Sequence, residues 1–208
     1  MRERPILMTP ENAQKVFEGV KTQTRRLNGL DEVNSSKLWG YPQMQDSGIA
    51  VFLDSTQANP YNNALDVKCP YGLVGDRLWC RENGWERPYR TERMLREGAD
   101  TWEPFYYDAL LDIGEAEELK QLGFKRRPSI HMPRWACRTV VEVTEIRVER
   151  VQDISEEDAK AEGCEPHAPS GRDGKVYRRP FECLWESING KYSWDSNPWV
   201  WVIEFKKI

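Results

Sequence analysis

The sequence predicts an α+β fold in which a small β-barrel carries flanking helices and two long insertions. Several runs of alternating or β-branched residues predict strands, whereas only a few short stretches have the spacing of amphipathic helices. The chain also has nine tryptophans, which favour a well-packed core. Because strands outnumber helices, we expect the strands to form the barrel and the helices to lie outside it.

Length and composition bound the class of protein. A chain of 208 residues suits one domain, 1–208, with insertions at about 28–68 and 86–127. Its hydrophobic fraction of 39%, charged fraction of 31% and mean hydropathy of -0.76 are typical of a globular protein with much polar surface. We see neither a membrane-spanning run nor a signal peptide, so we expect no membrane partner and a location in the cytoplasm of a bacterial host.

The cysteines predict neither a disulfide framework nor a zinc site. Five cysteines are an odd number, and they are widely scattered without a CxxC pair. We therefore expect reduced thiols, no bound metal and no cofactor.

The net charge of -4 argues against a protein that coats duplex nucleic acid by bulk electrostatics. Two local basic stretches remain, KTQTRR (21–26) and KRRPSIHMPRWACR (125–138). The second mixes arginine with a tryptophan and a histidine, which suits single strands or one flipped base better than a duplex. The alternative is a solvated basic loop.

The first elements are a strand and a helix. RPILM (4–8) predicts a short strand, followed by Thr9 as N-cap and Pro10 at the first helical position. Gly19 supplies a left-handed exit, so 21–26 should leave the helix and enter a strand. One buried helix face is expected from residues spaced at i, i+3, i+4 and i+7: Ala13, Val16, Phe17 and Val20.

The middle of the chain alternates insertions with strands. Residues 28–68 are polar with weak periodicity, which predicts loops and short elements. CPYGLVGDRLWCREN (69–83) predicts a turn that leads into a strand. The second insertion, 86–127, is aromatic around TWEPFYYDALL and has a helical pattern through 114–123.

The last third predicts a long strand, two helices and a buried strand. RTVVEVTEIRVERV (138–151) changes its apolar register between Val143 and Ile146, as a bulge or tight bend requires. Ser155 caps a short helix that ends at Gly163 and carries Glu162 in its last turn. PFECLWESING (180–190) predicts a packing helix, and PWVWVIEFKKI (198–208) predicts a mostly buried strand.

Four blocks together resemble the ASCH domain family, whose fold is a PUA-like β-barrel. They are EGVKTQTRR (18–26), VGDRLW (74–79), VTEIRVERVQDISEEDAKAEG (143–163) and WVIEFKKI (201–208). Within that family the chain is most similar to larger, phage- and prophage-encoded proteins, which share KTQTRR, GDRLW-RE and an IHMPRWA-like segment. The core blocks cover roughly half of the chain, and the two insertions lie outside the minimal domain.

The resemblance implies a cleft for RNA or a modified nucleoside. A small bacterial member hydrolyses the acetyl amide of N4-acetylcytidine with a lysine, a threonine and a glutamate. The first two belong to a G-x-K-T-x-T motif, which matches GVKTQT here and implies Lys21 and Thr24. The glutamate ends the short helix after the long strand, which implies Glu162. This chain is about twice as long, so its insertions could reshape the cleft and change the substrate.

The three residue types make chemical sense for amide hydrolysis, which needs a nucleophile, a base and a proton for the departing amine. Thr24, or a water that it positions, would attack. Lys21 would be the base if burial and nearby arginines lower its pKa from about 10.4. Glu162 would orient Lys21 or protonate the leaving nitrogen, although its carboxylate would also raise the lysine pKa.

Further residues are candidate substrate contacts. Arginines would meet phosphates or base edges, Glu82 a cytosine amino group, and His131 and Trp135 the face of a base. The alternatives are surface salt bridges and packing. The full set is Arg25, Arg26, Glu82, His131, Arg134, Trp135 and Arg138.

The function that we predict is that of a nucleobase-binding ASCH protein, and the predicted activity is that of a metal-independent amidohydrolase acting on an acylated, N4-acetylcytidine-like nucleoside. Its partner would be a modified nucleoside or single-stranded RNA or DNA. A non-catalytic RNA or single-stranded nucleic-acid binding module and a ribonuclease are the alternatives, since both would use the same residues. A regulator that binds another protein would depend on the insertions instead.

Overall fold

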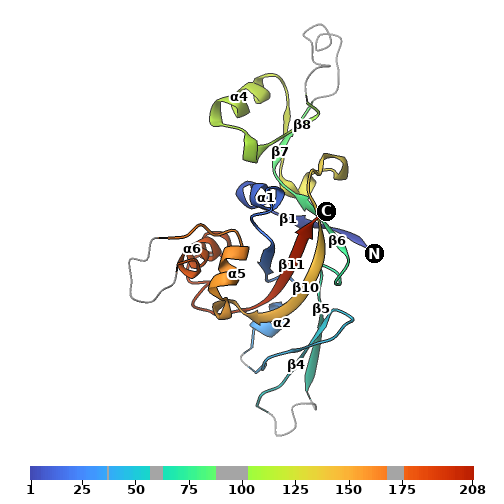
Figure 1. Cartoon of the computed structure of the whole chain (residues 1–208), viewed down its shortest axis with the longest axis vertical. Coiled ribbons are helices and arrows are strands. Elements are labelled where there is room, and N and C mark those ends of the chain that lie inside the picture. Colours follow the sequence, from blue (N-terminus) through green and yellow to red (C-terminus); the bar gives the residue numbers. More distant parts are fainter. Residues whose placement is uncertain (37, 57–62, 88–102, 168–175) are drawn as a thin grey trace.

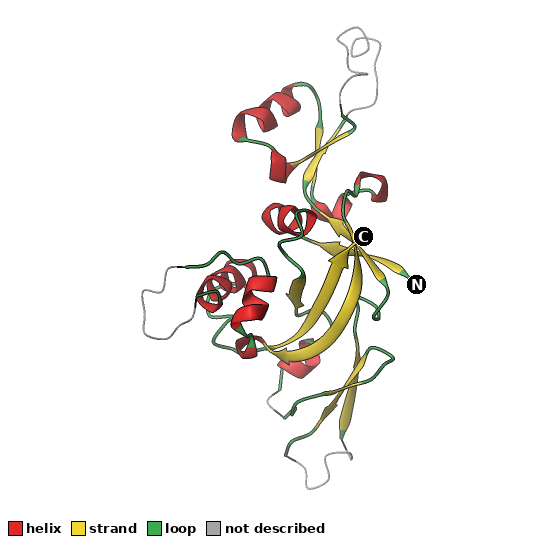
Figure 2. Ribbon diagram, viewed as in Figure 1, coloured by secondary structure: helices red, strands yellow, loops and turns green. Residues whose placement is uncertain are grey.

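The computed structural model describes residues 1–36, 38–56, 63–87, 103–167 and 176–208, so parts of both predicted insertions lie outside the described residues. The described part is an α+β fold, as predicted, with several sheets and a few helices (Figures 1 and 2). The strands are β1 (Glu3–Leu7), β2 (Gln23–Arg26), β3 (Gln43–Met44), β4 (Ile49–Leu53), β5 (Ala64–Lys68), β6 (Arg77–Arg81), β7 (Gly84–Glu86), β8 (Phe105–Tyr107), β9 (Lys125–Arg127), β10 (Val140–Arg150) and β11 (Trp199–Lys207). The α-helices are α1 (Pro10–Phe17), α2 (Asp31–Asn34), α4 (Ile113–Gln121), α5 (Glu156–Ala161) and α6 (Arg178–Asn189). Short 3-10 turns are η3 (Asp108–Leu110), η4 (Ser129–His131), η5 (Arg134–Ala136) and η6 (Val151–Asp153).

The central sheet has the order β1-β6-β10-β11-β2. Strand β1 runs parallel to β6, and the other neighbours are antiparallel. The long strands β10 and β11 curve together through the middle of the molecule (Figure 1). Their register shifts between Val143 and Glu145, which confirms the irregularity predicted from the change of apolar register.

This sheet is open between its edge strands, β1 and β2. In the described part of the chain no sheet is closed, so the barrel predicted from the sequence is not confirmed. Strands β1 and β2 are not paired, but a side chain connects them. Arg26 Nη2 donates to the Leu7 carbonyl at 2.6 Å and contacts Met8 Sδ at 3.2 Å. We call this gap between β1 and β2 the seam.

Strand β11 is buried on both faces because a separate apolar cluster packs against each. Trp201 and Ile203 belong to the larger cluster, which also includes Leu78 of β6 and Phe52 of β4. Val200 and Val202, which alternate with them along the strand, belong to a second cluster formed with Phe181 and Trp185 of α6. The prediction of a mostly buried strand is therefore confirmed, and α6 is placed against the central sheet.

Helix α1 begins as predicted but buries less than predicted. The Thr9 side chain accepts from the Asn12 amide, and Gly19 has a φ of 76°. The expectation that Phe17 and Val20 are buried is wrong, since they are 36% and 50% exposed. The helix ends at Phe17, so Val20 lies beyond its apolar face, and the Phe17 ring is covered by charged groups of Arg138 and Lys207.

The first insertion contains more regular structure than predicted, and the second contains strands that were not predicted beside the predicted helical stretch. The first forms the sheet β3-β4-β5, whose Ala50 and Phe52 enter the main core. The second forms the sheet β8-β7-β9 together with α4, as the helical pattern at 114–123 suggested. They extend from opposite ends of the molecule (Figure 1).

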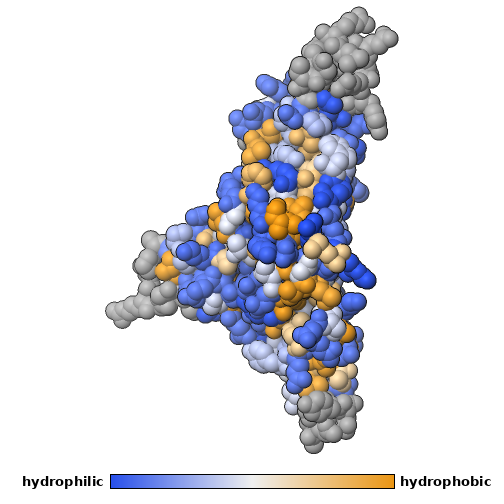
Figure 3. Space-filling view, turned by 45° about the vertical axis from the view of Figure 1, so that its right-hand side comes forward, coloured by the Kyte–Doolittle hydropathy of each residue, from blue (hydrophilic) through white to orange (hydrophobic). Residues whose placement is uncertain are grey.

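The face seen in Figure 3 is largely hydrophilic, with apolar areas near its middle, in keeping with the mean hydropathy of -0.76. Within the described ranges, no helix is long and apolar enough to cross a membrane.

Candidate functional site

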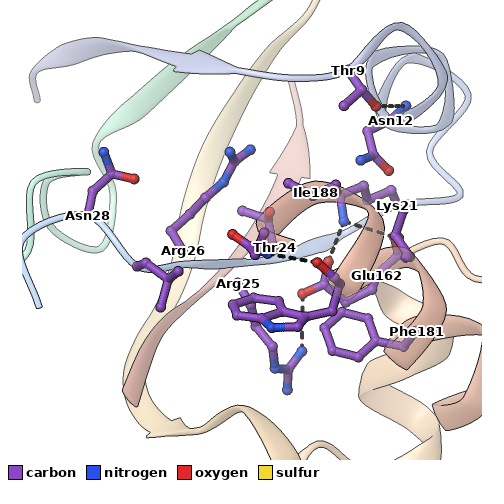
Figure 4. Close-up of a pocket in the computed structure, with 14 residues that line it drawn as sticks. Thr9, Asn12, Lys21, Thr24, Arg25, Arg26, Asn28, Glu162, Phe181 and Ile188 are labelled. Carbon is purple, nitrogen blue, oxygen red and sulfur yellow. Dashed lines mark hydrogen bonds and ion pairs between the residues drawn. The ribbon is translucent and has the colours of Figure 1, made fainter. Parts of the chain in front are cut away.

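A cavity of about 140 Å³ lies beside the seam. The start of α1 contributes Thr9 and Asn12, strand β2 contributes its polar side chains, and α6 forms an apolar wall (Figure 4). All three residues of the predicted catalytic trio line this cavity: Lys21, Thr24 and Glu162.

Local backbone structure delivers Lys21 and Thr24 to the cavity. The turn at Gly19 lets the Lys21 amide donate back to the Lys15 carbonyl at 3.0 Å, which directs the next residues away from the helix. Strand β2 then pairs with β11, and Thr24 lies opposite Ile203. As a result both side chains are sequestered, with Lys21 3% and Thr24 4% exposed.

Glu162 reaches the same place from the C-terminal end of α5. Ser155 caps this helix as predicted, because its side chain accepts from the Asp158 amide. The chain turns at Gly163, whose φ is 83° and where an added Cβ would lie 3.2 Å from the Lys21 Cβ and 3.1 Å from the Lys15 Cδ. A glycine is therefore required for the close approach of α5 to the start of β2.

The Lys21 amine is bound to Glu162 twice. Its Nζ donates to the Glu162 backbone carbonyl at 2.8 Å and also to the carboxylate Oε2 (Figure 4). Burial lowers the pKa of Lys21 below its ordinary value, and the Arg26 cation lowers it further, while the Glu162 carboxylate opposes both. The net direction is downward, so the neutral amine is favoured relative to a lysine in water.

Thr24 and Arg26 both line the cavity. In the described part of the chain the Thr24 hydroxyl has no hydrogen-bond partner, although it lines the cavity. Arg26 spends Nη2 on the seam, whereas its buried Nε has no partner among the described residues. Thr24 is therefore suited to hydrogen-bond a bound ligand, whereas the enclosed Arg26 Nε is not, and Arg26 contributes its positive charge to the cavity wall.

Arg25 points to the opposite side of β2 from the Arg26 guanidinium. Its side chain is 1% exposed and enters ion pairs with Glu149, Asp158 and Glu162. Although it borders the cavity, its guanidinium is occupied by protein acceptors.

Glu82 and Arg138 form a separate buried pair outside this cavity. Arg138 Nε and Nη2 donate to the two carboxylate oxygens of Glu82 at 2.9 and 2.8 Å. The guanidinium lies over the rings of Phe17 and Tyr107, with its Cζ 4.7 and 4.3 Å from their centroids. The structure therefore places these two predicted contacts in a packing junction between α1 and the second insertion.

The remaining predicted contacts lie in the η4–η5 segment, which does not line the cavity among the described residues. His131 is exposed, and Trp135 is 57% exposed with its ring edge-on to Phe105. Arg134 is paired with Glu3 through Nε at 2.6 Å.

Sequence reasoning missed most of the cavity wall. Asn12 was unremarkable within α1, and the apolar stripe of α6 predicted packing alone. Residues of that stripe differ in burial: Phe181 and Trp185 are buried, whereas Ile188 is 52% exposed and lines the cavity. An apolar stripe longer than the core requires is the signal that would have indicated a wall.

Among the described residues, no group of three or more histidine, cysteine, aspartate or glutamate side chains has a geometry that could hold a metal ion. Comparison of the chain with models of known families, with curated proteins and with solved structures finds no match. The ASCH resemblance therefore stays a prediction.

Proposed function

We propose that this chain is an ASCH-type protein with a PUA-like fold whose cavity binds an acylated nucleobase and hydrolyses its amide, as in N4-acetylcytidine. The observation that carries the proposal is the meeting of Lys21, Thr24 and Glu162 at one cavity, from segments 138 residues apart in the case of Thr24 and Glu162. A buried lysine whose pKa is lowered is a suitable general base near neutral pH.

The hydrogen bonds of Lys21 suit a neutral amine. A neutral amine has two N–H groups and one lone pair, and two donor bonds to Glu162 account for both N–H groups. The lone pair is then left for a proton from the cavity. Glu162 accepts from Lys21 on one oxygen and from Arg25 on the other, so its geometry fits an orienting carboxylate better than a proton donor.

The reaction that we propose uses one water molecule. Water bound by the Thr24 hydroxyl attacks the acyl carbonyl carbon, and Lys21 takes its proton. The C–N bond then breaks, and the Lys21 ammonium returns the proton to the departing nitrogen. The products are a carboxylic acid and the free amine of the base. Water is preferred to Thr24 as nucleophile because no hydrogen bond joins the Thr24 hydroxyl to Lys21.

Phosphate-binding alternatives are less well supported by the same geometry. A ribonuclease or an RNA-binding module needs cations with unoccupied donors. Arg25, Arg134 and Arg138 are each paired with a carboxylate. Arg26 alone among the four predicted arginines lines the cavity without an ion pair to a described residue, and one cation suits the carbonyl oxygen of a base or acyl group.

The test is release of cytidine from N4-acetylcytidine by the purified chain, followed by chromatography. We expect turnover that falls by about 10²- to 10⁴-fold in Lys21→Ala, the usual range for loss of a general base. Thr24→Ala should lower turnover less than Lys21→Ala, since the water can still enter. A wild-type chain that releases no cytidine would refute this substrate, and an acyl-threonine seen by mass spectrometry would refute the water route.

A further inference from the structure

Arg25 has no N–H donor left for a substrate. Its Nε donates to Glu149, its Nη1 to Gln23 and Glu162, and its Nη2 to Glu149 and Asp158. A guanidinium has five N–H groups, and these five bonds use each of them. A phosphate or base edge could bind here only by displacing an acceptor of the protein.

The acceptors around Arg25 are themselves held in place. Arg147 Nη2 donates to Asp158 Oδ2 at 2.9 Å, and Arg147 Nε donates to Glu149 Oε2 at 3.3 Å. Gln23 Nε2 bridges Asp158 and Glu204 at 3.0 and 2.8 Å. Arg25 thus stands in a network that begins at the partly exposed side of the sheet and ends at the cavity.

The network ends at the cavity with the Glu162 carboxylate, which accepts hydrogen bonds from two residues. Arg25 Nη1 binds Oε1 at 3.1 Å, and Lys21 Nζ binds Oε2. With one donor a carboxylate can swing about that bond, but two donors on different oxygens fix its plane. The position of the Lys21 amine depends on that plane, because Oε2 is one of its two acceptors.

We infer that Arg25 is a positioning residue: it fixes the Glu162 carboxylate and, through it, the Lys21 amine, and it does not touch the substrate. The kinetic consequence rests on the proposed function, whereas the effect on the Lys21 amine does not. The adjacent Arg26, on the opposite side of β2, lines the cavity without an ion pair to a described residue and is the arginine that we expect to meet the ligand.

The charges that face Lys21 decide the direction of the effect. Glu162 and Cys164 follow α5, Arg25 and Arg26 come from β2, and Lys15 of α1 donates to the Gly163 carbonyl at 2.6 Å. Without the Arg25 cation, Lys21 is the remaining charged group bound to the Glu162 carboxylate, so the carboxylate stabilises the Lys21 ammonium more strongly. The pKa of Lys21 should therefore rise.

The first measurement is titration of the Lys21 amine in the ligand-free protein by NMR of isotope-labelled lysines, with Lys21→Met to identify the signal. We expect Arg25→Gln to raise its pKa by about one unit or more, and Arg25→Lys, which keeps the charge, to bring it back toward wild type. A Lys21 titration that is the same in Arg25→Gln and wild type overturns the inference, whether or not the protein has the proposed activity.

The second measurement separates kcat from KM on N4-acetylcytidine. Arg25→Lys keeps the cation but has three N–H groups instead of five, so it should fold even if Arg25→Gln does not. We expect it to lower kcat about tenfold or more with little change in KM, and Arg26→Lys to act mainly on KM. A rise in KM alone for Arg25→Lys would make it a substrate contact and overturn the inference.

Arg138→Lys is the matched control, because Arg138 is another arginine paired with a buried glutamate and lies outside the cavity. It should leave kcat, KM and the Lys21 titration within about twofold of wild type. Equal losses in the Arg25 and Arg138 variants would mean that any buried arginine serves only the fold, which also overturns the inference.

Discussion

Among the described residues, two buried glutamates lie beside arginines, and their carboxylates are bound differently. Glu82 is 0% exposed, and both of its carboxylate oxygens accept from one guanidinium, that of Arg138. Glu162 is 3% exposed, and its two oxygens accept from two different residues, Arg25 and Lys21. We call the Glu82 carboxylate closed, because one arginine binds both of its oxygens. We call the Glu162 carboxylate divided, because two residues each bind one oxygen, so that the position of one cation affects the position of the other.

The surroundings of the two glutamates follow the same division. Aromatic rings cover the Arg138 guanidinium, so the Glu82 pair joins α1 to the second insertion without access to the cavity. At Glu162 the second donor is an amine at a cavity wall. A buried ion pair alone therefore does not distinguish the two glutamates, whereas a carboxylate shared with a lysine at a cavity does.

The largest effect on stability is expected at the closed pair. Arg138→Met removes the only charged partner that the described residues give Glu82 and leaves a buried carboxylate uncompensated. The free energy of unfolding should fall by about 3–5 kcal/mol, measured by urea denaturation.

The double variant Arg138→Met, Glu82→Leu is the control for that loss, since it removes both charges together. It should recover most of the stability, because replacing a whole buried pair by apolar groups is often neutral. If the double variant is as unstable as Arg138→Met, the loss comes from the packing of Phe17 and Tyr107 and the charge argument is wrong.

The next effect concerns the divided carboxylate and the pH dependence of turnover. Glu162→Gln removes the charge that raises the pKa of Lys21, while burial and Arg26 still lower it. The ascending limb of kcat/KM against pH should move to lower pH by roughly 1–3 units. Glu82→Gln should leave the limb in place. A limb that stays fixed in Glu162→Gln would show that Lys21 is not the base.

Local sequence rules predicted much of the fold. The Thr9 cap, the left-handed Gly19 and the Ser155 cap follow from contacts within a few residues, and the structure confirms them. The bulge after Val143 was indicated by a change of apolar register and is confirmed in the pairing of β10 with β11. The burial of Phe17 was predicted wrongly, because its covering groups come from Arg138 and Lys207, far away in the chain. The open sheet was missed for the same reason. Strands β1 and β2 are its edges, and whether they pair depends on the rest of the fold rather than on their own sequences.

The candidate site shows the same limit more sharply. A family motif drew attention to Lys21, Thr24 and Glu162, and the fold brings them to one cavity. No local pattern distinguishes Arg25 from Arg26, yet alternation along β2 sends one into a carboxylate network and the other to the seam. The carboxylate partners of Arg25 lie 124 to 137 residues away, so the sequence near β2 does not show which arginine enters ion pairs.

The smallest effect is a dependence of the free energy of unfolding on pH that Lys21 should produce. In the unfolded chain Lys21 holds its proton up to about pH 10.4, but in the folded protein burial lowers its pKa despite Glu162. Between these two pKa values the unfolded state binds more protons than the folded state. The contribution of Lys21 to the free energy of unfolding therefore rises with pH over that interval, by about 1.4 kcal/mol for each pH unit.

The measurement is the difference in the free energy of unfolding between wild type and Lys21→Met, obtained by urea denaturation from neutral pH to about pH 10. This difference should grow in favour of wild type as the pH rises. The cysteines, whose pKa values burial raises at Cys80 and Cys164, are present in both proteins and largely cancel. A difference that shrinks with rising pH would mean that Glu162 raises the pKa of Lys21 more than burial lowers it. Lys21 would then be a charged ion-pair partner, as Arg138 is for Glu82.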